Sequence, residues 1–345
     1  MTIPPIDKGA EELARKRWDG LTKPLGSLGV LEDLGIRIAG ITGHPLPSVH
    51  RKVIFTVAAD HGVAVEGVSA YPQEVTAQMV ANFLRGGAGI NVLSKQVGAE
   101  VFVVDAGVAG PVASTDGLIV SKIRQGTGNM VREPAMSRAE AEQVVESGMR
   151  IFQEVHRKKP IDLVGLGDMG IGNTTASAAL TAVLTGSPVA EVTGRGTGLT
   201  DRMLLNKIRV IELALDRHRP NLEDPIDCLE KVGGLEIGCL AGIVLAAAQA
   251  RVPVVLDGFI TSSAALLACR IAPLARDYLI ASHRSVEPGH GILLRAMKLQ
   301  PLLDLQMRLG EGTGAALGFF LVEASLKLLS EMATFSEAGV SGKTG

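Results

Sequence analysis

The feature that most constrains the fold is a short, β-branched apolar run that recurs along the chain and ends in an acid or a small polar loop. Continuously apolar runs of this length are typical of parallel strands that are covered on both faces. Four such runs end in an aspartate, and a weaker fifth, at 278–281, ends in a serine and a histidine. The four stronger runs span residues 53–59, 101–104, 161–166 and 252–256.

Segments with helical spacing of apolar residues lie between these runs. The clearest, 138–157, begins with a capping box formed by Ser137 and Glu140. Strands that alternate with helices predict right-handed crossovers, and five strands are too few for an eight-stranded barrel. We therefore expect an α/β fold with an open, doubly wound, mainly parallel sheet of the Rossmann-like kind. The other predicted helices span 73–84, 88–97, 176–184, 201–217 and 235–250.

The two ends of the chain carry apolar helical patterns but no strand-like run. Residues 1–43 and 301–333 are therefore expected to pack together as a small helical domain. Residues 44–300 then form the α/β substrate-binding domain. The last segment, 334–345, contains glycine and serine and is expected to be a flexible tail.

Composition argues against a nucleic-acid partner. Aromatic residues make up 3% of the 345 residues, and the formal net charge is −2 with no basic run. Proteins that bind DNA or RNA need a concentrated basic face, and many add aromatic platforms on which bases stack. The three cysteines, Cys228, Cys239 and Cys269, show no CxxC spacing and are expected to be buried, reduced side chains.

The sequence also argues against a membrane partner. Its longest apolar stretch, 238–258, is interrupted by Gln249, Arg251 and Pro253, which is typical of a buried helix followed by a strand. The first residues have neither a basic start nor an apolar segment of the kind found in signal peptides. We therefore expect a cytoplasmic protein.

Candidate functional residues gather where the predicted strands end. In open α/β sheets, ligands bind outside the carboxyl ends of the strands, where Asp60, Asp105, Asp168 and Asp257 would lie. An aspartate at a strand end often only caps the next turn, which is the role we expect for Asp105 and Asp257. Asp168 differs, because it lies within a glycine-rich turn.

That turn, 165–172, leads directly into Asn173, Thr174 and Thr175 at the start of an apolar helix. Glycine allows the backbone to approach an anion, and the free N–H groups of a helix start favour a phosphate. The spacing matches neither the dinucleotide nor the P-loop signature. A second glycine-rich loop, 194–198, precedes the predicted helix that contains Lys207.

Glu311 is the sharpest candidate, because it stands between Gly310 and Gly312 in a loop predicted to join two apolar helices. Flanking glycines would let its carboxylate project into a cleft, where apolar surroundings raise a carboxyl pKa toward neutrality. A carboxylate of this kind is suited to act as a general base. The alternative is an exposed turn without chemical function.

These segments, taken together, resemble the nicotinate-nucleotide:dimethylbenzimidazole phosphoribosyltransferases, the enzymes that activate the lower-ligand base in cobamide assembly. The matching segments occur in family order between about residue 20 and residue 333. They are TKPLGSLG at 22–29, ADHGV at 59–63, YPQEVT at 71–76, GLGDMGIGNTT at 165–175, KVGG at 231–234, VLDGF at 255–259, SH at 282–283 and RLGEG at 308–312.

The resemblance implies transfer of the phosphoribosyl group of nicotinate mononucleotide to 5,6-dimethylbenzimidazole, with Glu311 as the general base and Asp168 as a second catalytic carboxyl. Many relatives carry a glutamate at position 168, so the shorter aspartate leaves its role open between catalytic and supporting. The resemblance further implies a phosphate and ribose site and a base-binding pocket. The phosphate and ribose site would comprise Gly170, Asn173, Thr174, Thr175, Gly196, Lys207, Ser285 and Gly314, and the pocket Tyr71, Met79 and Leu309.

The resemblance also implies a homodimer that needs neither a cofactor nor a metal. The sequence agrees on the metal, because the strand end at Asp257 lacks the paired acids of the pyrophosphate-donor enzymes. His61, His283 and His290 likewise show no ligand spacing on a single helix. The natural base among benzimidazoles, purines and phenolics stays open.

Two other functions remain open from the residues alone. A related nucleotide-handling transferase or nucleosidase would share the phosphate loops but accept water or another base. A non-catalytic nucleotide-binding protein would use Glu311 only as a turn residue. Release of nicotinate with the benzimidazole, without it, or not at all distinguishes the three.

Overall fold

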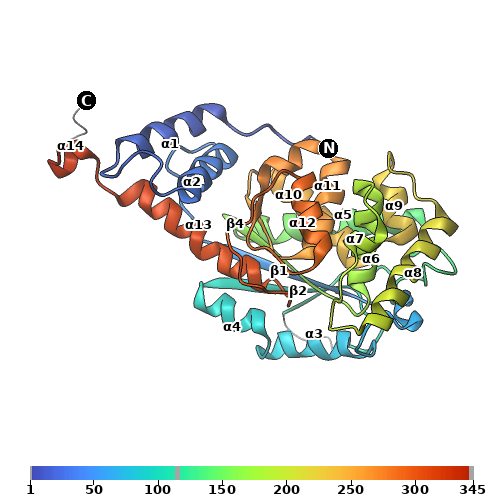
Figure 1. Cartoon of the computed structure of the whole chain (residues 1–345). Helices are drawn as coiled ribbons and strands as arrows, with labels where there is room; N and C mark the ends of the chain where they lie inside the picture. The colour runs from blue at the N-terminus through green and yellow to red at the C-terminus, as the bar shows by residue number, and fades with distance from the viewer. Residues whose placement is uncertain (1, 113–116, 342–345) are drawn as a thin grey trace.

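The computed structural model describes residues 2–112 and 117–341, and its centre is one six-stranded parallel sheet (Figure 1). The strands lie in the order β3-β2-β1-β4-β5-β6, which is the order of a Rossmann fold. The predicted open, doubly wound sheet is therefore confirmed. The strands are β1 (Lys52–Ala59), β2 (Ala99–Gly107), β3 (Leu118–Val120), β4 (Leu163–Met169), β5 (Val254–Leu256) and β6 (Leu279–Ala281).

Helices cover both faces of this sheet. Alternate residues of β1 point to opposite faces, so Val53 and Phe55 join one core cluster and Ile54 joins the other. Helices α5, α6, α10 and α11 pack on the first face, and α2, α3, α4 and α13 pack on the second. The helices that flank the sheet are α2 (Val30–Thr42), α3 (Val75–Arg85), α4 (Gly89–Gln96), α5 (Arg138–Lys158), α6 (Asn173–Thr185), α10 (Leu235–Gln249), α11 (Phe259–Ile271) and α13 (Thr313–Glu331).

The remaining helices lie at the margins and at the chain ends. They are α1 (Lys8–Gly20), α7 (Val189–Val192), α8 (Asp201–His218), α9 (Pro225–Val232), α12 (Pro288–Ala296) and α14 (Phe335–Ala338), with short 3-10 turns at Gly62–Glu66 and Pro273–Tyr278. Each of the six helices predicted between the strands is present, with bounds that differ by no more than a few residues. Strand β3 was not predicted, because it is only three residues long and half-exposed at the sheet edge.

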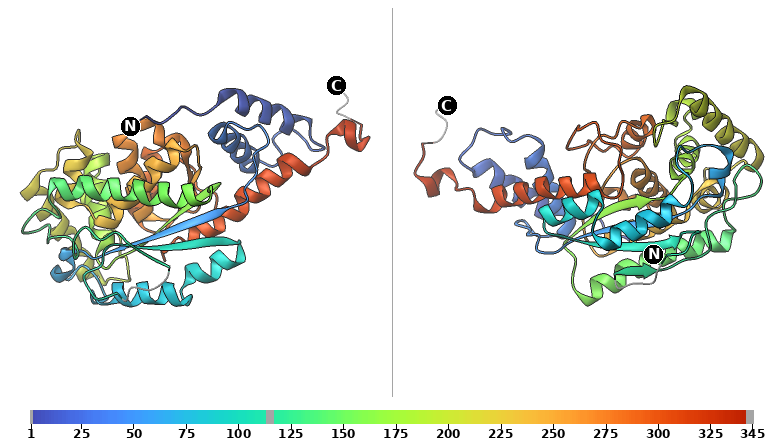
Figure 2. Two further views of the ribbon diagram at one scale, coloured as in Figure 1. Left: turned by 180° about the vertical axis from the view of Figure 1, so that it is seen from behind. Right: turned by 90° about the horizontal axis from the view of Figure 1, so that it is seen from below.

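Helices from the two chain ends meet away from the sheet, where α13 extends outward to α1 and α2 (Figures 1 and 2). Trp18, Ile36 and Leu329 form a small apolar cluster there, separate from the two sheet cores. The first half of α13 packs on the sheet instead, through residues such as Phe319. Helix α13 therefore packs on the sheet with its first half and on the helices of the amino-terminal segment with its second half.

The segment before α13 differs from the structure predicted for it. Glu311 lies in a segment that joins two helices, as predicted, but the first of them is α12, which ends at Ala296. Residues 301–312 were expected to be helical and are not. The apolar residues there pack extended beside β6, with Leu303 bridging to His283 and donating its N–H to the Ser282 carbonyl. Beyond the carboxyl end of α13, Thr334 and Glu337 form a capping box for the short helix α14, within the predicted tail. Residues 342–345 lie outside the described part of the chain.

Among the described residues, α13 alone has both the length and the hydropathy of a membrane span, and 56% of its apolar window is buried inside the protein. This is weak evidence for a membrane, since the core helices of soluble proteins have the same properties. The contacts of α13 with the sheet and with α2 account for its apolar residues, so no membrane is needed to explain them.

Helices α5 and α10 pack closely enough to require glycine. A Cβ atom on Gly242 would lie 2.0 Å from the Val145 carbonyl oxygen, and one on Gly148 would lie 1.9 Å from that of Cys239. Gly242→Ala is therefore expected to lower the free energy of unfolding by about 1–3 kcal/mol, measured by urea denaturation.

Gly291→Ala is the matched control. A Cβ at Gly291, within α12, meets only a side-chain nitrogen at 3.6 Å. Alanine should leave stability unchanged there or raise it by up to about 1 kcal/mol, because it favours the helix. If the two variants are equally stable, close packing of α5 on α10 is not what requires a glycine.

Candidate active site

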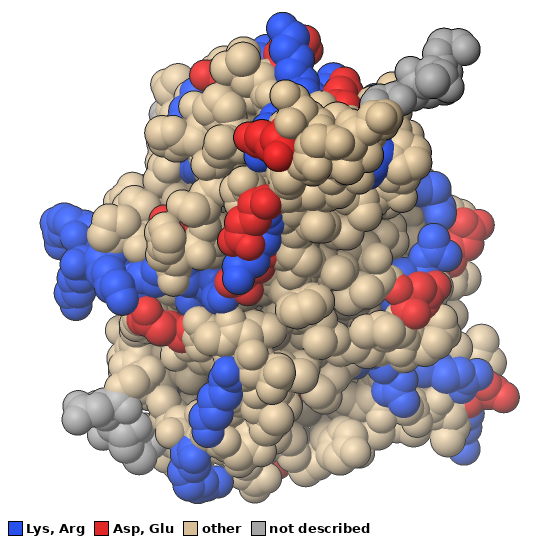
Figure 3. All heavy atoms as spheres, turned by 90° about the vertical axis from the view of Figure 1, so that its left-hand side faces the viewer, with Lys and Arg blue, Asp and Glu red and all other residues tan. Residues whose placement is uncertain are grey.

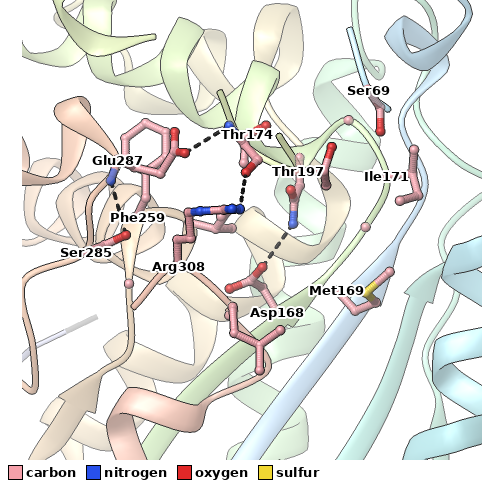
Figure 4. Close-up of a pocket in the computed structure, with 18 of the residues that line it drawn as sticks. Ser69, Asp168, Met169, Ile171, Thr174, Thr197, Phe259, Ser285, Glu287 and Arg308 are labelled. Atoms are coloured by element: carbon pink, nitrogen blue, oxygen red, sulfur yellow. Dashed lines mark hydrogen bonds between the residues drawn. The ribbon is translucent and has the colours of Figure 1, made fainter. Parts of the chain in front are cut away.

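A cavity of about 280 Å³ opens outside the carboxyl ends of β4, β5 and β6, close to the point where the strand order reverses (Figure 4). Strand ends and the loops that follow them supply its walls. The lining residues are Val68, Ser69, Tyr71, Asp168, Met169, Gly170, Ile171, Gly172, Asn173, Thr174, Gly196, Thr197, Gly258, Phe259, Ile260, His283, Ser285, Glu287, Arg308, Leu309 and Gly310.

The structure brings eight of the residues singled out from sequence to this cavity: Tyr71, Asp168, Gly170, Asn173, Thr174, Gly196, Ser285 and Leu309. The other five lie beside or behind its wall. Glu311 and Gly314 flank the lining loop at Gly310, and Lys207 and Thr175 are buried near Thr174. Met79, on α3, is half-buried and packs against the apolar core of the sheet.

Glu311 has a left-handed backbone with φ +66°, a conformation that is uncommon outside glycine. Contacts with neighbouring strands hold it there. Its N–H donates to the Asp168 carbonyl at 3.2 Å, and its own carbonyl accepts from the Thr56 hydroxyl at 2.9 Å. A Cβ atom on Gly167 would lie 2.2 Å from the Glu311 carbonyl oxygen, so only glycine admits this approach.

Asp257 holds the other side of the same loop. Its carboxylate accepts hydrogen bonds from the Gly312 N–H at 2.8 Å and the Gly314 N–H at 2.7 Å, and it is 1% exposed. The expectation that Asp257 caps its own next turn is therefore wrong, because its partners lie more than fifty residues away. Asp105 does cap its turn, since it accepts from the Val108 N–H at 2.8 Å.

The Glu311 carboxylate lies against the start of α4 and is 5% exposed. Its Oε2 atom accepts from the Ile90 N–H at 3.1 Å. Burial raises its pKa, the Ile90 and Gly89 N–H groups oppose this, and the nearby Asp257 carboxylate adds to the rise. The net effect is a raised pKa, which makes Glu311 a better proton acceptor than an exposed glutamate.

Asp168 is the second buried acid. Its Oδ2 atom accepts from the Asn173 amide at 2.9 Å, and its Oδ1 atom has no partner within residues 2–112 and 117–341. Burial, and then the charges of Asp257 and Glu236, raise its pKa well above the ordinary value. These surroundings favour the neutral, protonated form of Asp168.

Lys207 reaches the cavity only through Thr174. Its Nζ atom is completely buried and donates to the Thr174 hydroxyl oxygen at 2.7 Å and to the Gly194 carbonyl at 3.3 Å. Burial lowers the pKa of Lys207 to about 8, although the Glu287 carboxylate opposes the change. Because the Thr174 oxygen accepts from Lys207, its hydroxyl proton is free to donate toward the cavity.

The second glycine-rich loop is already tied to other side chains. The Gly196 N–H donates to Glu287 Oε1 at 2.9 Å, and the Gly196 carbonyl accepts from Arg308 at 2.9 Å. Figure 4 shows Arg308 between Glu287 and Asp168, with Thr174 facing the same space. The cavity thus has a polar side at Thr174, Arg308 and Glu287.

The opposite side of the cavity is more apolar. Met169 and Ile171 line it, and Tyr71 and Leu309 stand at its mouth, 54% and 60% exposed. Exposed apolar side chains beside a cavity are suited to cover a flat ring. Met79, predicted for this role, does not line the cavity.

Sequence reasoning missed Arg308, Glu287, His283 and Phe259 as lining residues. Arg308 could have been found from its place directly before the Gly310–Gly312 motif. Glu287 precedes Pro288 at the start of α12, a position where acids are common and usually exposed. Its place in the sequence therefore gave no sign of a role in the site. Its burial depends on Gly194, whose missing side chain leaves room for the carboxylate, and no local pattern predicts this contact.

Buried ion pairs surround the site without forming a metal centre. His61 lies 2.8 Å from Glu236, and His283 lies 3.4 Å from Asp257. In the part of the chain that the structure describes, no group of three His, Cys, Asp or Glu side chains could hold a metal ion.

On the face shown in Figure 3, basic and acidic side chains are interspersed and lie mainly toward the margin.

Comparison with known proteins gives one consistent result. A family model described as phosphoribosyltransferase matches residues 3–340. A protein of Desulforudis audaxviator named nicotinate-nucleotide–dimethylbenzimidazole phosphoribosyltransferase is 56% identical over 98% of this chain and 96% of its own length. One of the same name from Chloroflexus aggregans is 57% identical over 99% and 96%. The crystal structure of CobT from Thermus thermophilus superposes with a TM-score of 0.94 at 47% identity, covering 97% of this chain and all of that one.

Removal of the Asp257 carboxylate tests whether it holds the Glu311 loop. Asp257→Ala leaves two buried N–H groups without an acceptor, at a cost of about 1–3 kcal/mol each. We expect amide hydrogen exchange in residues 310–316 to accelerate markedly, as measured by mass spectrometry.

Asp105→Ala serves as the control, because it removes a strand-end aspartate whose carboxylate, among the described residues, contacts the Val108 N–H of its own turn and Lys122. It should leave exchange in residues 310–316 unchanged. Equal protection of that segment in wild type and Asp257→Ala would show that other contacts hold the loop.

Proposed function

We propose the following reaction path for this chain, which belongs to the nicotinate-nucleotide–dimethylbenzimidazole phosphoribosyltransferase family. The enzyme transfers the phosphoribosyl group of nicotinate mononucleotide to 5,6-dimethylbenzimidazole and releases nicotinate and α-ribazole 5′-phosphate. The reaction belongs to the assembly of the cobalamin nucleotide loop.

The chemistry requires a single base. Nicotinate is joined to ribose through a cationic ring nitrogen, so it leaves as a neutral ring nitrogen and needs no general acid. The acceptor must lose its N–H proton as its other nitrogen attacks the anomeric carbon. Attack from the side opposite nicotinate inverts that carbon, which converts a β-nucleotide into an α-nucleotide. The path uses neither a cofactor nor a metal.

Glu311 takes the proton. The observation that carries this assignment is a buried carboxylate with a raised pKa, at a backbone position held from both sides by Asp257 and Asp168. A base fixed in this way loses little orientational freedom on binding the acceptor, so positioning contributes to the rate. Its place beside Leu309 and Gly310 puts it at the edge of the cavity.

Asp168 supports this reaction as a neutral acid. Its protonated form adds no negative charge beside Glu311, and its unpaired Oδ1 atom is available for a hydrogen bond in the cavity. Asn173 fixes its orientation through the other oxygen. We therefore assign Asp168 a contact with the donor and leave the role of the base to Glu311.

The donor phosphate binds at the polar side of the cavity. The Thr174 hydroxyl and N–H donate to it, the start of α6 supplies a favourable dipole, and Lys207 supplies positive charge from behind Thr174. The N–H groups of Asn173 and Thr175 already bond to the carbonyls of Gly170 and Gly172. Gly170 and Ser285 line the same side, while Thr175 and Gly314 support it from behind. Gly196 contributes through its loop, since its N–H already bonds to Glu287.

The benzimidazole binds against the apolar side, between Tyr71, Leu309 and Met169. Its N–H then faces the Glu311 edge of the cavity. Met79 acts only through the packing of α3, because it is half-buried against the core and does not line the cavity.

We also propose that the enzyme works as a homodimer in the cytoplasm. The division into an α/β domain at 44–300, a small helical domain from 1–43 with 301–333, and a flexible tail at 334–345 is part of the same proposal. The separate apolar cluster around Trp18 and Leu329 supports the helical domain.

Glu311→Gln is expected to keep the fold while turnover falls by about 10²–10⁴-fold, because the amide cannot accept the proton. The measurement is nicotinate release with and without dimethylbenzimidazole, alongside a melting curve. Glu331→Gln, an exposed glutamate at the end of α13, should be as active as wild type. Near-normal turnover of Glu311→Gln would contradict the assignment, and release without the acceptor would indicate a nucleosidase.

Lys207→Met is expected to raise the KM for nicotinate mononucleotide by about 10- to 100-fold and to leave the KM for dimethylbenzimidazole nearly unchanged. Because the pKa of Lys207 is about 8, its charge is lost as the pH rises through that value. Donor KM in wild type should therefore rise above pH 8, and the rise should be absent in Lys207→Met. An equal rise in the KM for both substrates would indicate a structural role for Lys207 instead.

A further inference from the structure

Glu287 is a buried carboxylate that the reaction path above does not use. It precedes α12, is 6% exposed and lines the cavity. One oxygen, Oε1, accepts from the Gly196 N–H at 2.9 Å. The other, Oε2, is buried and has no hydrogen-bond partner among the described residues.

The two nearby cations do not satisfy this second oxygen. Lys207 directs its Nζ atom at Thr174 and the Gly194 carbonyl, and Arg308 bonds to the Gly196 carbonyl. A buried acceptor without a partner costs about 1–3 kcal/mol, more when it is charged. Anchoring the 194–198 loop needs only Oε1, so a purely structural role leaves Oε2 unexplained.

The carboxylate is also held rigidly. The Glu287 N–H donates to the Ser285 hydroxyl at 3.3 Å, and the carboxylate fills the space left by Gly194, where a Cβ atom would lie 2.0 Å from Oε2. In Figure 4 the side chain points toward the same space as Thr174 and Arg308. The carboxylate is therefore held at a fixed position in the wall of the cavity.

The chemistry of Oε2 selects its partner. A carboxylate repels the donor's phosphate and the nicotinate carboxylate, and it accepts hydrogen bonds from neutral hydroxyl groups. The only neutral hydroxyls of the donor are those at ribose C2′ and C3′, which lie close to the phosphate-bearing C5′. Thr174 and Lys207, assigned to the phosphate, lie beside Glu287 through Gly196 and Gly194.

Asp168 has the other unpaired carboxyl oxygen in the cavity, but its place differs. Gly310, next to Glu311, lies beside it, since a Cβ atom there would be 3.3 Å from Asp168 Oδ2. Asp168 therefore faces the end of the cavity where the proton is transferred. Glu287 faces the phosphate end, where the sugar hydroxyls belong.

We propose that Glu287 recognises the ribose of the donor, with Oε2 accepting a hydrogen bond from the 2′- or 3′-hydroxyl. This inference rests on the proposed function. Hydrogen bonds to the 2-hydroxyl of a sugar strengthen as positive charge develops at the anomeric carbon, so the contact favours the transition state as well as binding. The enzyme is accordingly selective for ribonucleotide over deoxyribonucleotide donors.

The test compares kcat/KM for nicotinate mononucleotide with that for its 2′-deoxy and 3′-deoxy analogues. Wild type is expected to prefer the ribonucleotide by about 10- to 100-fold over at least one analogue. In Glu287→Ala this ratio falls toward one, because the ribonucleotide loses its contact and the deoxy analogue has none to lose. Glu287→Gln keeps an acceptor for the Gly196 N–H and shows an intermediate ratio.

Lys207→Met is the matched control, since it slows all three donors by a similar factor and leaves the ratio unchanged. Wild type that uses all donors equally well overturns the inference without any variant. The inference is also overturned if both Glu287 variants still release nicotinate and prefer the ribonucleotide over the deoxy analogues by the same ratio as wild type. Absence of nicotinate release from every donor in wild type overturns the proposed function itself, and this inference with it.

Discussion

The active site depends on the fixed left-handed backbone of Glu311. Contacts from three adjacent strands meet at this residue: the Thr56 hydroxyl on β1, the Asp168 carbonyl on β4, and the Asp257 carboxylate after β5, which holds the residues that follow. Strained backbone of this kind persists only where its surroundings over-determine it. The sheet thus fixes both the position of the carboxylate and the start of α13.

The same arrangement also brings three buried acids close together. Asp168, Asp257 and Glu311 lie together where the strands end, and burial with mutual repulsion raises the pKa of Asp168 and of Glu311. Two N–H groups donate to the Asp257 carboxylate, whereas Asp168 has one amide donor and an oxygen without a partner among the described residues. Different hydrogen bonding thus distinguishes three similar acids, and this difference supports the separate roles proposed for them.

Local patterns predicted five of the six strands, the helices between them and the sheet edge where the cavity opens, because buried strands and capped helix starts are encoded over a few residues. Contacts made at long range were not predictable in this way. Asp257 was taken for a turn cap although it binds Gly312 and Gly314, and Glu287 carried no signal at all. Residues 301–312 were taken for helix because their apolar content suits either structure, and pairing beside β6 decides the outcome.

The most direct test of this account is a crystal structure of the enzyme with dimethylbenzimidazole bound in the cavity. The account predicts one benzimidazole nitrogen within about 2.6–3.2 Å of the Glu311 carboxylate, with the ring against Tyr71 and Leu309. The other nitrogen should face the side of the cavity lined by Thr174 and Arg308, where the donor ribose phosphate would bind. A benzimidazole nitrogen bonded to Asp168, with Glu311 out of reach, would contradict it.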